Sequence, residues 1–133
     1  MLTTVISFAG NCNEAISFYK EVLGAEVKVI NYFKDAPKNS GMDSSLPSHF
    51  VMHSELLIEG SEIAMTDGVE KAPTGDNFSF LITKESANEV TVLYHKLLEG
   101  GRVIEALAPA FWASMYGCVK DRFGVCWQIM TPK

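Results

Sequence analysis

The pair His53 and Glu55 combines two side chains that can do acid–base or metal chemistry. They are two residues apart in an extended apolar run, so strand alternation places them on one face, with Leu56 and Ile58 on the other. A carboxylate beside an imidazole can orient it as a general base. Alternatively, the two side chains can bind a metal ion together with water molecules that complete its coordination shell. A strand histidine satisfied by backbone or solvent, or one that contacts a ligand, fits the same pattern, so the role of His53 stays open.

A second set of candidate residues lies in FWASMYGCVKDRFGVCWQIM, residues 111–130. Trp112 and Tyr116 combine aromatic faces with polar tips, which suit the wall of a site for a planar or amphipathic ligand. Gln128 alternates with Trp127, and we expect Gln128 to face a cleft and Trp127 to face the core. Ordinary packing in a core or a dimer explains the two wall aromatics as well. If they have a function, it is binding rather than reaction.

The other reactive and charged residues of the chain point to structural roles. The chain has an odd number of cysteines, Cys12, Cys118 and Cys126, and they lack CxxC spacing. We therefore expect them to be free thiols that pack in or near the core. Cys12 lies near a predicted helix start, which can lower a thiol pKa but is weak evidence by itself. In the predicted turn 120–122, Asp121 is expected to cap the backbone.

Bulk composition limits the classes of function. The chain has 133 residues and a net charge of -5, with its eleven Lys and Arg scattered. This disfavours nucleic acid and anionic membrane as partners. No apolar run approaches the length that spans a bilayer, and the start MLTTVISFAG lacks the features of a secretory signal. We therefore expect a cytoplasmic protein.

The chain contains an internal duplication. NEAISFY at 13–19 matches NEVTVLY at 88–94, each as part of a predicted helix. The first helix is predicted to begin with a capping box of Asn11 and Glu14, and the second with a box at 86–89. Each ends in glycine, at Gly24 and at 100–101. The surrounding strands repeat too, with hairpin turns at glycines 60 and 124.

This repeat predicts an α+β fold of two tandem βαβββ units, residues 1–68 and 76–133, in a single domain of residues 1–133. One helix covers only one face of a four-stranded sheet, so we expect cupped mixed sheets whose free faces meet around a ligand cleft. The segment 34–48 is predicted to be a mobile loop, and 67–77 the connection between the units. Exposed sheet edges and cleft mouths favour a homodimer.

Three motifs give the chain a family resemblance: FxGNCxEAxxFYxxxxG at 8–24, HxELxI at 53–58 and FWxxxYGxxxDxFGVxW at 111–127. They resemble the vicinal oxygen chelate superfamily, which includes glyoxalase I, bleomycin-resistance proteins and extradiol dioxygenases. The closer similarity is to its PhnB-like branch, often labelled 3-demethylubiquinone 3-methyltransferase-like. The resemblance covers essentially the whole chain and supports the paired-unit fold.

The resemblance also implies where a divalent metal would bind: at the first and last strands of each unit, on His and Glu ligands. Carried over by register, those places fall near Thr4, Ala64, Asn77 and Gln128. Alanine cannot ligate, and the other three are weak neutral donors. We therefore predict no metal ligands and no required cofactor. The methyltransferase label also lacks support, because no glycine-rich loop with a following acidic residue is present to hold a methyl-donor nucleotide.

The sequence thus favours a small-molecule binder without the usual divalent metal. Its expected ligand-binding residues are His53, Glu55, Trp112, Tyr116 and Gln128. One alternative is a lyase, isomerase or dioxygenase-type enzyme that uses His53 and Glu55 as acid and base or as an atypical metal site. A second alternative is a dimeric interaction protein without a ligand.

Overall fold

The computed structural model describes residues 1–36, 46–68, 75 and 77–133 of the chain. The chain divides into two compact units, Met1–Pro73 (unit 1) and Thr74–Lys133 (unit 2). The division lies inside the connection predicted at 67–77, most of which falls outside the described residues. Residues 37–45 of the predicted loop 34–48 also lie outside them.

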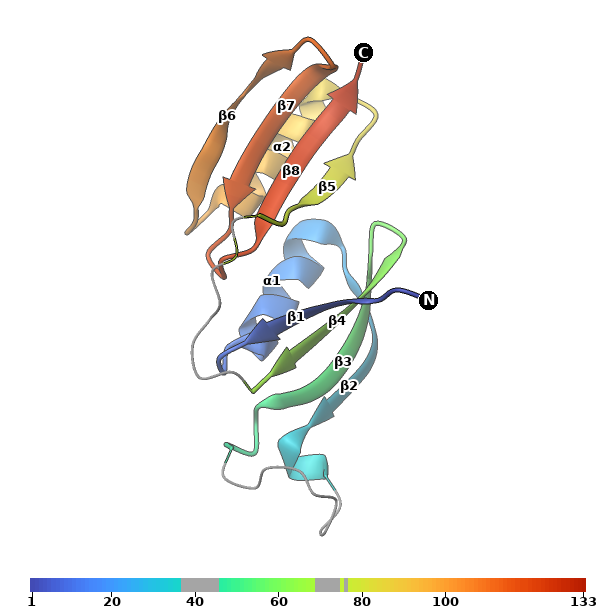
Figure 1. Cartoon of the computed structure of the whole chain (residues 1–133), viewed down its shortest axis with the longest axis vertical. Helices are drawn as coiled ribbons and strands as arrows, with labels where there is room; N and C mark the ends of the chain where they lie inside the picture. The colour runs from blue at the N-terminus through green and yellow to red at the C-terminus, as the bar shows by residue number, and fades with distance from the viewer. Residues whose placement is uncertain (37–45, 69–74, 76) are drawn as a thin grey trace. The chain divides into compact units, whose positions relative to one another are not determined.

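Unit 1 is a four-stranded mixed sheet with one helix (Figure 1). Its elements are β1 (Thr4–Phe8), α1 (Cys12–Leu23), β2 (Glu26–Tyr32), the short 3-10 helix η1 (Phe33–Asp35), β3 (Val51–Ile58) and β4 (Ser61–Asp67). The strand order is β1-β4-β3-β2, with β1 parallel to β4 and the other pairs antiparallel. The start of the predicted loop 34–48 is therefore helical, because η1 includes Lys34 and Asp35.

Unit 2 repeats this plan. Its elements are β5 (Phe80–Thr83), α2 (Ala87–Leu98), β6 (Arg102–Ala110), β7 (Ala113–Lys120) and β8 (Cys126–Pro132). The order β5-β8-β7-β6 is that of unit 1, again with one parallel pair, β5 with β8. Figure 1 shows α2 behind the strands, covering one face of the sheet. The prediction of two tandem βαβββ units with mixed sheets is confirmed.

The buried face of each sheet follows from alternating apolar residues. In unit 1, Leu56 and Ile58 of β3 and Ile63 and Met65 of β4 are buried on the side of α1. In unit 2, the indole of Trp127 on β8 is 1% exposed, as predicted for a core residue. Burying such large side chains stabilises each unit by about 1.5–3 kcal/mol per side chain.

Close approach of helix and sheet in unit 2 depends on one glycine. A Cβ placed on Gly117 of β7 would lie 2.6 Å from ring atoms of Tyr94, which projects from α2. The absent side chain lets the Tyr94 ring pack directly on the strand. Its hydroxyl then donates to the backbone carbonyl of Glu105 on β6 at 3.3 Å. The helix therefore holds the edge strand β6 by a hydrogen bond as well as by packing.

Of the two predicted N-cap hydrogen bonds, only that of α2 is present. The Ser86 hydroxyl accepts from the Glu89 backbone N–H at 3.1 Å, as predicted for α2. For α1 the prediction is wrong: Asn11 occupies the N-cap position, but its side chain makes no capping hydrogen bond. The carboxylate of Asp67, at the end of β4, accepts from the Gly10 and Cys12 N–H groups at 2.8 and 3.1 Å.

Asp67 does more than cap α1. Its second carboxylate oxygen accepts from the Val51 N–H at the start of β3, at 2.9 Å. The side chain is buried, so all three hydrogen bonds are formed away from bulk water. One carboxylate therefore joins the end of β4, the start of α1 and the start of β3.

Asp121 has the structural role predicted for it. One of its carboxylate oxygens accepts from the Phe123 and Val125 N–H groups at 2.8 and 3.0 Å. The other accepts from the Trp127 indole N–H at 2.9 Å. The carboxylate thus fixes the turn at Gly124, which has a φ of 87°, and orients the largest core side chain of unit 2.

Within the described residues, neither helix has the length and apolar character that crossing a bilayer requires.

Replacing Asp67 by alanine is expected to destabilise unit 1. Three buried N–H groups lose their acceptor, which costs about 2–4 kcal/mol in the free energy of unfolding. Urea unfolding followed by far-UV circular dichroism measures this loss. Glu21→Ala, at an exposed position of α1, is the matched control and should change the free energy by less than about 0.5 kcal/mol. Equal effects of the two substitutions would contradict the capping role.

Candidate ligand-binding site

The strand pairing of unit 2 defines a row of side chains across the face opposite α2. Gln128 of β8 is paired with Cys118 of β7 and with Leu81 of β5, and Cys118 is paired with Glu105 of β6. Paired residues share a face, and the neighbour of Gln128 on β8 is the buried Trp127. This row therefore lies on the free face of the sheet.

Three of the predicted site residues form one connected group on this face. The Tyr116 hydroxyl donates to Oε1 of Gln128 at 2.9 Å. Gln128 in turn donates from Nε2 to the Ser79 hydroxyl at 2.6 Å. The ring of Trp112 lies edge-on to that of Tyr116, with centroids 5.4 Å apart. The predicted wall of Trp112, Tyr116 and Gln128 is thus one continuous surface, extended by Ser79.

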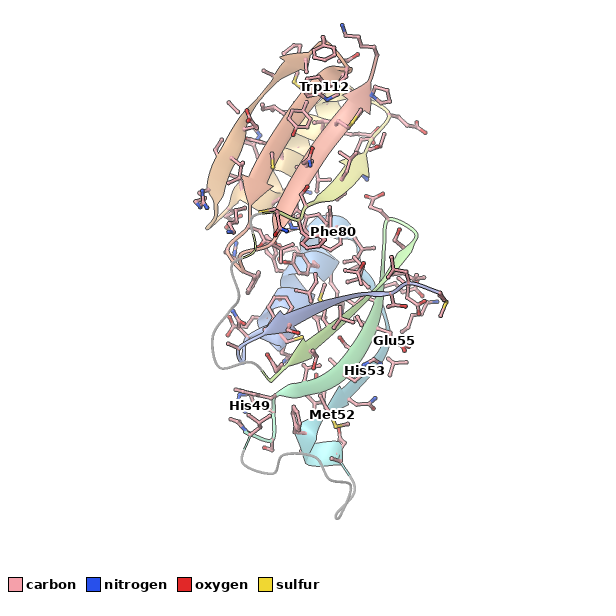
Figure 2. All side chains as sticks on the ribbon, viewed as in Figure 1. His49, Met52, His53, Glu55, Phe80 and Trp112 are labelled. Atoms are coloured by element: carbon pink, nitrogen blue, oxygen red, sulfur yellow. The ribbon has the colours of Figure 1, made fainter. Side chains whose placement is uncertain are left out.

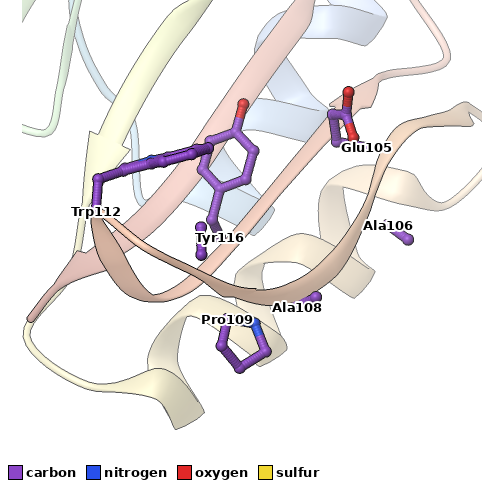
Figure 3. A pocket seen from close by; sticks show the side chains of 7 residues that line it. Glu105, Ala106, Ala108, Pro109, Trp112 and Tyr116 are labelled. Carbon is purple, nitrogen blue, oxygen red and sulfur yellow. The ribbon is translucent and has the colours of Figure 1, made fainter.

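A pocket of about 270 Å³ lies beside this group, within unit 2 (Figure 3). Its lining consists of Trp112 and Tyr116 with residues of β6: Glu105, Ala106, Ala108, Pro109 and Ala110. The small side chains of three alanines and a proline leave room for the pocket, and the two aromatic rings form its border. Trp112 lies in the turn between β6 and β7 rather than at the start of a strand, and it is 49% exposed. The pocket is open to solvent and is framed by aromatic and small side chains.

The irregular backbone of β6 produces this hollow. The pairing of β6 with β7 shifts register three times, between Val103 and Glu105, Glu105 and Ala108, and Ala108 and Ala110. Such bulges bend a strand and change the direction of its side chains. Pro109 is tolerated because β6 is an edge strand, where one missing N–H breaks no internal ladder.

The surroundings of Tyr116 favour the protonated form of its phenol. Loss of hydration raises the pKa of Tyr116, and the neighbouring Cys118 and Glu105 raise it further. A protonated phenol is needed for the hydrogen bond that it donates to Gln128. Glu105 and Tyr116 line the same pocket.

The other two predicted site residues, His53 and Glu55, lie on the free face of unit 1. Nε2 of His53 is 3.2 Å from Oε1 of Glu55, and both side chains are partly exposed on β3 (Figure 2). Leu56 and Ile58 are buried on the other face, as alternation predicted. The strand neighbours of Glu55 in its row are the apolar Val29, Ala64 and Val5, whereas His53 is paired with the polar Asn31 of β2.

The structure shifts two of the four places predicted for a metal. Thr4 is paired with the buried Ile63, so it lies on the α1 side, and the free-face neighbour of Ala64 is Val5. In unit 2 the strand residue beside Gln128 is Leu81, whereas Asn77 precedes β5. The expected places are therefore even poorer in donors than the sequence indicated. No group of three or more His, Cys, Asp or Glu able to hold a metal occurs in the described part of the chain.

A reactive thiol at the start of α1 is also disfavoured. Burial, together with the charge of Asp67, raises the pKa of Cys12 to about 12. Burial likewise raises the pKa of Cys118, as do the nearby Cys126 and Glu105. All three cysteines are free, as predicted, and Cys12 is a protonated packing residue.

Sequence reasoning missed Glu105, Ser79 and the small residues of β6. The only sequence signal was the run ALAPA before FW, where small residues and a proline interrupt an apolar strand. Such a run marks an edge strand or a bulge, but it does not indicate which side chains turn toward a pocket.

The fold is that of glyoxalase-like and fosfomycin-resistance proteins. The fosfomycin resistance protein FosX of Listeria monocytogenes superposes with a TM-score of 0.69 at 12% identity, over 100% of this chain and 93% of that one. At this identity the comparison shows the fold alone. It confirms the predicted vicinal oxygen chelate architecture.

The family follows from the sequence match. The profile described as 3-demethylubiquinone-9 3-methyltransferase matches residues 1–130, and the chain belongs to that family. It is 32% identical to Protein YjdN of Escherichia coli K12, over 99% of this chain and 95% of that one. The crystal structure of PA1353 from Pseudomonas aeruginosa is 28% identical, with a TM-score of 0.85, over 99% and 97% of the two chains. The predicted branch of the superfamily is confirmed.

The raised pKa of Cys12 predicts its chemical behaviour. At pH 8 only about one Cys12 thiol in ten thousand is ionised, so iodoacetamide should not modify it in the folded protein. The less buried Cys126 should react first. Peptide mass spectrometry after timed alkylation measures both residues. In urea all three cysteines should react, and rapid modification of Cys12 in the folded chain would contradict its buried, protonated state.

Proposed function

We propose that this chain is a small-molecule-binding protein that holds its ligand in the Trp112–Tyr116 pocket of unit 2 without a resident divalent metal. The observation that carries the proposal is the pocket itself, with its aromatic border of Trp112 and Tyr116. Tyr116 joins it to Gln128 and Ser79, which do not line the pocket, by the hydrogen bonds described above. A hydrogen-bonded Tyr and Gln at the edge of an apolar hollow is the usual composition of a ligand site. At about 270 Å³, the pocket suits a small ligand or one part of a larger one.

The residue types support a function without metal. The places implied for ligands hold Val5, Ala64, Leu81 and Gln128, of which only Gln128 has a side chain that can coordinate a cation. A neutral amide oxygen that already accepts from Tyr116 is a poor ligand for a divalent ion. The residues do not fit the metal of the superfamily, so no step is assigned to one.

The residues also fail to fit a methyl-donor nucleotide. The glycine after β1 is Gly10, and a Cβ placed on it would lie 2.6 Å from the ring of Phe50, so protein already fills the space beside it. After β5 the chain continues as Lys84, Glu85 and Ser86, without glycine. Neither turn therefore has the open, glycine-rich backbone that such a nucleotide would approach. Methyl transfer is therefore not part of the proposal.

A second candidate function rests on the contact between His53 and Glu55. At 3.2 Å the carboxylate can orient the imidazole as a general base for a lyase or isomerase reaction, or the two can begin an atypical metal site. The exposure of both side chains and the apolar row across Glu55 favour this role less than binding in unit 2.

Titration with Zn²⁺, Mn²⁺ and Ni²⁺ separates these candidates. Isothermal titration calorimetry of the metal-stripped protein should give no tight site of one ion per chain, and His53→Ala should leave the titration unchanged. A stoichiometric site that His53→Ala removes would favour the His53–Glu55 enzyme and contradict binding without metal.

Loss of the Trp112 ring should weaken binding in unit 2. In a fragment screen by ¹H–¹⁵N correlation spectra, hits should shift the amides of residues 105–116 and 128. Trp112→Ala should weaken those hits by about 10- to 30-fold, because a buried aromatic contact contributes about 1.5–2 kcal/mol. The control is Phe78→Ala, which removes a side chain that is 79% exposed and does not line the pocket. The proposed site would be contradicted by hits whose affinity is unchanged in Trp112→Ala, or by hits that shift only amide signals of unit 1.

A further inference from the structure

The pocket beside Trp112 and Tyr116 has an electron-rich border, in which the indole N–H of Trp112 is the side-chain donor left besides the Tyr116 hydroxyl among the described lining residues. Glu105 contributes a carboxylate, and Trp112 and Tyr116 contribute the electron-rich faces of their rings. The remaining lining residues, three alanines and a proline, carry no side-chain donor. None of the residues that line this pocket in the described part of the chain is Lys, Arg or His.

The hydroxyl of Tyr116 adds to this electron-rich character. Its single O–H group donates to Oε1 of Gln128, and Gln128 is held in that orientation by its own hydrogen bond to Ser79. The proton of Tyr116 is therefore committed inside the protein. The lone pairs of its oxygen remain available to accept from a ligand N–H.

The backbone around Glu105 is held by the helix beneath the sheet. Tyr94 of α2 donates to the Glu105 carbonyl, and Gly117 provides the space for the Tyr94 ring. Glu105 is paired with Cys118, which places its side chain on the face of Tyr116 and Gln128. The buried Tyr94 thus holds the backbone from which the Glu105 side chain projects. Figure 3 shows that side chain at the pocket, beside Tyr116.

We propose that the pocket selects small organic cations, meaning ligands with an amine or quaternary ammonium group beside an apolar or aromatic part. This inference rests on the proposed function and names the ligand class of the same site. A cation over the exposed Trp112 ring gains a cation–π interaction, and the Glu105 carboxylate attracts the same charge. An anion meets the Glu105 carboxylate, and the described lining has no Lys, Arg or His to offset the repulsion. The net charge of -5 acts in the same direction at longer range.

Three probes of similar shape test the charge preference: benzyltrimethylammonium, benzyl alcohol and benzoate. Each is titrated into ¹⁵N-labelled protein at low salt, and the Trp112 indole signal and the amides of residues 105–116 report binding. The ammonium probe should bind about tenfold more tightly than the alcohol, and benzoate should bind most weakly. Added sodium chloride should reduce the advantage of the ammonium probe, because salt screens the carboxylate.

The variant Glu105→Gln isolates the contribution of the carboxylate. It should weaken binding of the ammonium probe about 3- to 10-fold and change the affinity for the alcohol by less than about twofold. The control is Glu85→Gln, which removes the same charge from an exposed position before α2, outside the pocket lining. It should leave the affinities for both probes unchanged.

The outcomes separate this inference from the proposed function. If benzyl alcohol or benzoate binds at these amides as tightly as the ammonium probe, the cation preference is overturned while the binding site stands. If Glu105→Gln and Glu85→Gln have the same effect, the preference arises from overall charge and the role of Glu105 is overturned. If no probe shifts these signals at millimolar concentration and the fragment screen also gives no hits there, both proposals fail.

Discussion

Each unit depends on one buried carboxylate that joins backbone segments by several hydrogen bonds. In unit 1, Asp67 accepts from the N–H groups of Gly10, Cys12 and Val51, so the end of β4 holds the start of α1 and the start of β3 together. In unit 2, Asp121 holds the β7–β8 turn and the indole of Trp127, the largest side chain of the core. A buried carboxylate without such donors would cost several kcal/mol, so each arrangement is stable only with all its hydrogen bonds present.

Covering one face by one helix leaves the other face of each sheet free, and the internal duplication makes the two free faces comparable. The central row of unit 1 is Val29, Glu55, Ala64 and Val5, and that of unit 2 is Glu105, Cys118, Gln128 and Leu81. The rows occupy the same strand positions but differ in chemistry. Where unit 1 has Ala64, unit 2 has an amide that joins Tyr116 to Ser79. The fold therefore supplies two equivalent platforms, and single residues decide which of them is polar.

Much of this could be predicted from the sequence because it depends on local periodicity. Strand alternation placed Trp127 in the core and Gln128 on the free face, and the repeat gave the order of elements in both units. The capping of α1 could not be predicted, because Asp67 is 55 residues from the N–H of Cys12 that it accepts. The sequence indicated a local cap by Asn11, but the distant Asp67 accepts from the N–H groups at the start of α1 instead. The place of Thr4 was wrong by one residue, which in a strand exchanges one face for the other.

Glu105 was missed for a different physical reason, and that reason bears on function. Face prediction assumes a regular strand, whereas β6 changes register on both sides of Glu105. The bulges that interrupt the regular alternation of side chains also form the pocket at the sheet edge. Pro109 has no N–H to donate, so a regular hydrogen-bond ladder cannot form there. Meanwhile Tyr94, reaching past Gly117, fixes the carbonyl of Glu105 from behind. The proposed binding capacity of unit 2 therefore depends on the departure of its edge strand from the fold that the two units share.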